Sequence, residues 1–192
     1  MMKTMLFGNT ILILSVALLS TSVFSAASAS SGSAYKGQHL RSIKALSQQD
    51  IDGYLNGKGM GFAKAAELNH YPGPRHVLDL SKELKLSNKQ LEQTQTLFDE
   101  MQTKAIKLGK QLIENEQKLD QLFAKGSVDK NTLETTLLDI GMTQAKLRNV
   151  HLSTHLEQKK LLTRHQIMMY DQLRGYGGNG SPNHENGHKH NH

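Results

Sequence analysis

The feature that most limits the possible folds is a pair of long stretches, residues 88–125 and 130–161, in which apolar residues recur every three or four positions. This spacing places them on one face of a helix that packs on a partner. In the first stretch the apolar positions are Leu91, Phe98, Met101, Ala105, Leu108, Leu112, Leu119 and Leu122. At 1.5 Å per residue this helix would be about 55 Å long. The sequence therefore predicts an all-α fold built on a long antiparallel helical hairpin.

The second stretch is apolar on two sides. Its first stripe runs through Leu133, Leu137, Ile140, Gln144, Leu147 and His151. Its second stripe runs through Leu138, Met142, Ala145, Leu152 and Leu156. One stripe can pack within the hairpin, whereas the other needs a further helix or another subunit. Because a thin monomer would leave this apolar surface exposed, we expect a homodimer.

Glycine and proline divide the remaining chain. Pro74 follows a firm break at residues 72–73 and suits the first turn of a helix over residues 75–84. Gly126 can end the first long helix in a left-handed cap. A last short helix is expected over residues 164–173. Residues 30–73 are interpreted as a loosely structured segment with short helices and a glycine hinge at residues 57–61. The hairpin domain is expected over residues 74–176.

Two five-residue motifs, at residues 86–90 and 162–166, have the form Leu-Ser/Thr-x-x-Gln. Ser87 and Thr163 are predicted N-caps, and Gln90 and Gln166 can reach back to complete two capping boxes. Since the boxes begin different helices, the sequence predicts that their stabilising effects add independently.

Residues 1–29 are typical of a secretory signal peptide. Lys3 supplies the positive start, an apolar run covers residues 11–19, and Ala27-Ser28-Ala29 fits a cleavage site. The chain contains no cysteine, which excludes a disulfide framework and argues against a thiolate metal site. We therefore expect an exported protein without disulfides.

Charge and motif content argue against two functional classes. The formal net charge is +6, but the basic residues are dispersed and the chain is expected to be exported, so we expect no nucleic-acid partner. We find neither a G-x-S-x-G nor a Walker sequence, and no strand pattern to support a catalytic pocket. The sequence predicts a binding protein and not an enzyme.

Histidines supply the candidate metal ligands. His151 and His155 are four residues apart, hence on one helix face, and can share a metal ion. Two imidazoles need further ligands, for which His76, His70 and Glu67 are the candidates.

The C-terminal tail, residues 177–192, is a different kind of candidate metal-binding segment. Its low apolar content predicts disorder. The tail histidines are expected to bind Zn, Ni or Cu weakly. These residues are His184, His188, His190 and His192.

The two capping boxes at residues 86–90 and 162–166 flank a long helical hairpin that follows a signal peptide. This arrangement resembles the Spy/CpxP/ZraP group, which are periplasmic LT-x-x-Q stress proteins related to heavy-metal sensors of the CnrX type. The resemblance covers about residues 74–176. It implies a periplasmic four-helix protomer that dimerises, and either ATP-independent chaperoning or the sensing of metal or envelope stress.

Two functional hypotheses follow. In the first, histidine-bound metal biases a helix arrangement that a membrane-bound regulatory partner detects. In the alternative, a Spy-type chaperone holds unfolded client proteins with apolar patches and basic residues. The basic residues of this second hypothesis are Lys104, Lys107, Lys110, Lys146 and Arg148. The histidines favour the first hypothesis, and the basic, two-sided helices favour the second.

Overall fold

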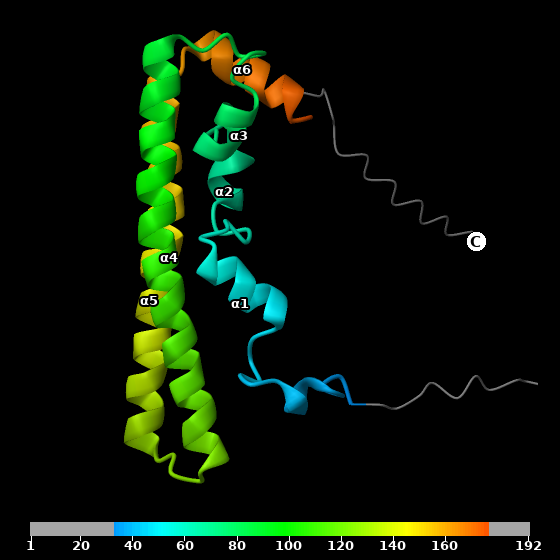
Figure 1. Cartoon of the computed structure of the whole chain (residues 1–192), viewed down its shortest axis with the longest axis vertical. Helices are drawn as coiled ribbons and strands as arrows, with labels where there is room; N and C mark the ends of the chain where they lie inside the picture. The colour runs from blue at the N-terminus through cyan, green and yellow to red at the C-terminus, as the bar shows by residue number, and fades with distance from the viewer. Residues whose placement is uncertain (1–32, 177–192) are drawn as a thin grey trace, which may run out of the picture. The chain divides into compact units, whose positions relative to one another are not determined.

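The computed structural model describes residues 33–176, and all of its regular structure is helical. Residues 33–36 belong to a separate N-terminal unit, so the description below concerns residues 37–176. Two long helices, α4 (Asn88–Ala124) and α5 (Lys130–Leu161), pack side by side (Figure 1). The all-α prediction is confirmed, and the predicted bounds of both helices agree to within one residue. None of the described helices combines the length and apolar character needed to cross a membrane.

The connection between α4 and α5 is set by local backbone chemistry. Gly126 has φ +61°, and the backbone N–H of Ser127 donates to the Leu122 carbonyl at 3.0 Å. These features form a glycine-terminated helix end. Asp129 then caps α5 by accepting from the backbone N–H of Thr132 at 2.8 Å. Both devices act within a few residues, and the Gly126 helix end is the one that the sequence analysis predicts.

The surface between α4 and α5 is partly polar. Its apolar cluster consists of Ala105, Leu112, Ile140 and Leu147. Buried threonines alternate with these residues, and the hydroxyls of Thr136 and Thr143 each donate to the carbonyl four residues earlier at 2.7 Å. Leu137 and Gln144 of the predicted first stripe are exposed. That part of the prediction was wrong. Threonines are small, and their hydroxyls are satisfied by carbonyls of the same helix, so they can occupy the packed face.

Shorter helices lie against the long pair. They are α1 (Gln48–Leu55), α2 (Lys64–Glu67) and α3 (Pro74–Asp79), preceded by a 3-10 turn at Gln38–Leu40. Helix α1 packs on α4, α2 on α5, and α3 on both. At the α1 contact, the Tyr54 carbonyl occupies the position where a side chain on Gly109 would lie. The short helices that the sequence predicts before residue 74 therefore lie against the long pair, whereas Leu40 of the 3-10 turn is 81 % exposed.

Helix α6 (Arg164–Leu173) closes one end of the molecule with α3. The apolar cluster there consists of Val77, Leu84, Leu162 and Tyr170. The helix predicted over residues 75–84 ends at Asp79. Residues 80–86 instead form turns, in which Lys85 has φ +50° and the Leu86 N–H donates to the Ser81 carbonyl at 3.0 Å.

The two capping boxes form as predicted and also bond each other. Ser87 and Gln90 exchange hydrogen bonds at 3.0 and 3.2 Å, and Thr163 and Gln166 do so at 2.9 and 3.2 Å. The Gln90 and Gln166 amides are reciprocally bonded at 2.8 and 3.1 Å. Gln90 also donates to the Leu161 carbonyl. Groups in one hydrogen-bond network usually contribute non-additively, so the structure leads us to expect coupled boxes in place of the independent boxes expected from sequence.

Candidate metal centre

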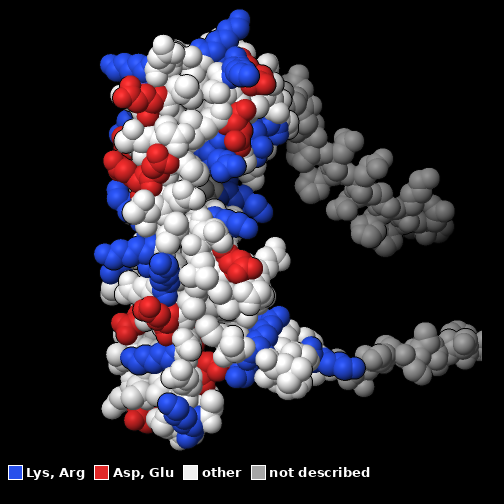
Figure 2. Space-filling model, viewed as in Figure 1, with Lys and Arg blue, Asp and Glu red and all other residues white. Residues whose placement is uncertain are grey.

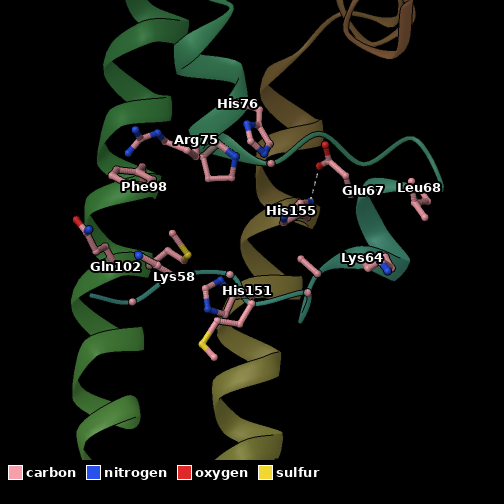
Figure 3. Close-up of a pocket in the computed structure, with 18 of the residues that line it drawn as sticks. Lys58, Lys64, Glu67, Leu68, Arg75, His76, Phe98, Gln102, His151 and His155 are labelled. Atoms are coloured by element: carbon pink, nitrogen blue, oxygen red, sulfur yellow. Dashed lines mark ion pairs between the residues drawn. The ribbon is translucent and has the colours of Figure 1, made fainter. Parts of the chain in front are cut away.

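A cavity of about 650 Å³ lies between the segment 56–76 and the long helices (Figure 3). Helix α5 contributes His151 and His155 to its wall, four residues apart as the sequence predicts. Segment 56–76 contributes the glycine-rich loop that follows α1, together with Glu67, Gly73 and His76.

His155 is buried, and its orientation is set by the backbone of another segment. Its Nδ1 lies 2.7 Å from the carbonyl oxygen of Tyr71, which can only accept a hydrogen bond. Nδ1 therefore carries the proton in neutral His155, and Nε2 is left with a free lone pair. A backbone carbonyl that fixes the tautomer in this way is the usual support of a metal-binding imidazole.

Gly73 lets the His155 ring approach the backbone closely. A Cβ atom at residue 73 would lie 2.8 Å from His155 Cε1, 2.9 Å from His155 Nε2 and 3.5 Å from Glu67 Oε2. Its backbone φ of −87° is open to any residue, so the glycine is required by the close approach and not by its conformation. Any side chain at residue 73 would push the His155 ring out of this position.

Glu67 is held by one oxygen and free at the other. Its Oε1 accepts from the hydroxyls of Tyr170 and Tyr176, at 2.5 and 3.3 Å, and lies 3.5 Å from Arg174 Nε. Burial and the Glu67 contact raise the pKa of Tyr170 well above its ordinary value, so this hydroxyl stays a donor. Oε2 is buried without a hydrogen-bond partner among residues 33–176, 3.8 Å from His155 Nδ1.

His151 is almost fully buried, with 4 % of its surface exposed, and stacks on Phe62 at a centroid distance of 5.8 Å. Its Nε2 has no hydrogen-bond partner within the described part of the chain. Burial, with repulsion from His155 as a smaller cause, lowers the pKa of His151. The ring therefore stays neutral at physiological pH, as a metal ligand must be.

The structure brings together only some of the predicted ligands. His76 lines the same cavity, with its Nδ1 3.7 Å from Asp79. His70 lies elsewhere, in a left-handed backbone conformation with its Nδ1 2.8 Å from Asp171. Residues 33–176 contain no preformed group of three or more metal-ligating side chains. A metal ion at this site would need the side chains to adjust.

The tail histidines, His184, His188, His190 and His192, lie outside the described residues, as does the predicted signal peptide, residues 1–29. His184-Glu185-x-x-His188 has the H-E-x-x-H spacing, which is a zinc signature only on a helix. Asn186 and Gly187, inside that motif, are weak helix formers. The spacing alone therefore does not indicate a second zinc centre.

Three participants in the site were missed from the sequence. Gly73 was interpreted only as part of a chain break, and Tyr170 and Arg174 carried no signal. Tyr170 lies 103 residues from the carboxylate it bonds, beyond the reach of any local pattern.

No family model, curated protein or solved structure matches this chain.

Proposed function

We propose that this chain is an exported, periplasmic metal-binding protein of the stress-response type, with His151, His155 and Glu67 as ligands. The supporting observation is that Oε2 of Glu67 and Nε2 of His151, both buried and without a hydrogen-bond partner among the described residues, belong to side chains that line the same cavity as His155. Because buried polar atoms are nearly always bonded, two such atoms at one cavity favour a ligand there.

The donor set favours particular ions. Imidazole and carboxylate suit Zn, Ni or Cu, and the sequence offers no cysteine for softer sites. Three protein donors leave a fourth position for water or another ligand.

A sensor would need the site to act on another element, and Glu67 supplies that connection. Its Oε1 is bonded to Tyr170 of α6, so a shift of the carboxylate toward His155 would alter the α6 contact. Under this proposal, the position of α6 is what a membrane-bound regulatory partner would detect.

Calorimetry with zinc, nickel and copper tests the proposal. The protein should be the mature chain with its four tail histidines changed to serine, so that weak tail binding does not interfere. We expect one tight site per protomer, abolished by His151→Ala combined with His155→Ala and weakened at least tenfold by Glu67→Gln.

The matched control is His165→Ala, which changes an exposed histidine of α6. It should leave the affinity unchanged. Absence of binding of all three ions at micromolar concentrations by the parent protein would refute the metal site.

An exposed apolar face on α5 supports a second proposal, a homodimer. Leu138, Met142 and Leu156 are 50 to 64 % exposed, although all lie on one well-formed helix. Together with Ala145, Asn149 and Leu152, they alternate at spacings of four and three, the repeat of a coiled-coil seam. Such a face needs a partner.

The order of these positions favours an antiparallel pairing of two copies. The spacing is symmetric about Leu147, so a two-fold axis there would place Leu138 of one copy opposite Leu156 of the other.

Sedimentation should show a dimer that Leu138→Glu and Leu156→Glu each dissociate. A mixture of Leu138→Glu and Leu156→Lys should recover dimers, which a parallel pairing would not allow. A monomeric parent protein would exclude the proposal.

The same face also supports the alternative proposal, a Spy-type chaperone that binds unfolded clients without ATP. The test is suppression of the aggregation of an acidic, reduced client. Charge reversal at Lys104, Lys107 and Lys110 should weaken it through lost attraction. Lack of protection at a several-fold molar excess of the parent protein would exclude this alternative.

A further inference from the structure

The cavity beside His151 is far larger than a metal ion requires. Its volume of about 650 Å³ compares with roughly 30 Å³ for one water molecule in the liquid. It falls within the range of about 300 to 1,000 Å³ typical of pockets for small organic molecules. Most of this space is therefore open to something other than an ion.

The cavity wall includes apolar side chains. Phe98 and Met101 of α4 line it next to Gln102, and Met60 and Leu68 line the loop side. Met60 and Leu68 are 39 and 53 % exposed. An occupant with an apolar body would cover these side chains and remove them from water.

The charged side chains that line the cavity are mostly basic. Lys58, Lys64 and Arg75 line it, and Glu67 is its single acidic lining residue among residues 33–176. The charge of Glu67 is already balanced by Arg174, 3.5 Å away. Arg75 is already paired with Asp79, whose Oδ1 lies 3.3 Å from the guanidinium Nε, whereas no carboxylate of the described residues lies within salt-bridge distance of Lys58 or Lys64. Figure 2 shows basic side chains at the level of α2 and α3, with acidic side chains beside them.

We propose that this cavity binds a small organic anion, a monocarboxylate with an apolar body. Lys58 and Lys64 supply positive charge for the carboxylate, and Phe98 and Met101 lie along the apolar part. The Arg75 guanidinium already lies 5.7 Å from the centroid of the Phe98 ring, so a cation and an apolar surface are side by side. The inference goes beyond metal binding and does not depend on it.

Charge and shape together select this class of ligand. An inorganic anion would leave Met60 and Leu68 exposed, and an alkyl cation would meet three positive side chains. Calorimetry on the full mature chain in a chelating buffer separates these cases. Decanoate, below its micelle concentration, is the probe, and acetate and decyltrimethylammonium are the ligand controls.

We expect one decanoate per protomer, with decyltrimethylammonium at least tenfold weaker and no heat from acetate. Equal binding of decanoate and decyltrimethylammonium would overturn the proposal, because it would show a merely apolar surface. Absence of decanoate binding at millimolar concentration would overturn it as well. If acetate binds as tightly as decanoate, the apolar wall has no role and the proposal fails.

Variants of exposed residues locate the binding without disturbing the core. Lys58→Glu combined with Lys64→Glu should weaken decanoate at least tenfold, whereas Lys118→Glu, on an exposed part of α4, should not. Leu68→Ser should weaken it several-fold, and Leu138→Ser on the outer face of α5 should not. The opposite pattern for the two leucines would place decanoate on the α5 face and overturn the proposal.

The metal proposal and the anion proposal fail separately. Decanoate binding without zinc binding would refute the metal centre and leave the anion site standing. Zinc binding without decanoate binding would do the reverse.

Discussion

Buried polar groups are hydrogen-bonded at the two linked capping boxes, whereas some of those in the cavity wall are not. At the boxes, Gln90 and Gln166 bond each other, their own helix starts and the carbonyls of Leu84 and Leu161. In the cavity, Oε2 of Glu67 and Nε2 of His151 are equally buried and have no partner among the described residues.

This difference separates polar groups that stabilise the fold from groups available to a ligand. A fully bonded buried network rigidifies the elements it joins. An unbonded buried atom costs stability, so its presence beside a cavity indicates a function that compensates for the cost. Changes at the capping boxes should therefore lower the free energy of unfolding, and changes at the cavity should lower ligand affinity.

The largest expected effect comes from Gln166→Ala. It removes the bond to the Leu84 carbonyl and leaves the Gln90 amide partly unpaired, so the free energy of unfolding should fall by about 2 to 3 kcal/mol. Urea denaturation measures this change. Gln117→Ala, on an exposed part of α4, is the control and should change stability by less than about 0.5 kcal/mol. An equally small effect of Gln166→Ala would show that the network does not stabilise the fold.

Gly73→Ala tests the other region. The added methyl group would lie 2.8 to 2.9 Å from the His155 ring and displace it, so zinc affinity should fall at least tenfold with every ligand residue still present. Gly59→Ala, on the rim of the same cavity with open space around its Cβ, should leave zinc binding unchanged. Calorimetry compares the two variants, and equal zinc affinity in both would contradict the proposed position of the site.

The double variant Ser87→Ala with Thr163→Ala tests the link between the boxes. Each single change should cost about 1 kcal/mol. Because Gln90 and Gln166 share hydrogen bonds, the double variant should differ from the sum by about 0.5 kcal/mol or more. A double-mutant cycle in urea measures this coupling, and strict additivity would restore the independent boxes predicted from sequence.

The smallest effect is the pH dependence of His151. Its folded-state pKa is lowered from 6.5, so the unfolded chain takes up a proton first as pH falls. The free energy of unfolding should therefore fall as pH drops below about 6.5 and level off below the lowered folded pKa. In metal-free protein, His151→Phe should remove this part of the pH dependence, and His165→Gln should retain it. Parallel pH profiles for the parent protein and His151→Phe would contradict the assigned pKa shift.

The sequence identified half of the candidate centre. The four-residue spacing of His151 and His155 placed both on one face of α5, and Glu67 was a candidate through its position before the chain break. His70 was a candidate for the same reason, yet it pairs with Asp171 instead. Nearness to a break in the chain does not determine which side chain turns toward the long helices.

The amino-acid sequence by itself determined where α4, α5 and α6 begin and end, but not where α3 ends. The bounds of α4, α5 and α6 depend on caps, on Gly126 and on a three-to-four residue period, all of which act within about one helical turn. Tertiary structure alone decided that Gln90 meets Gln166, 76 residues away, and that Gly73 leaves space against His155. These contacts depend on how whole helices pack, and that packing is set by many weak interactions spread along the chain, which no single motif encodes.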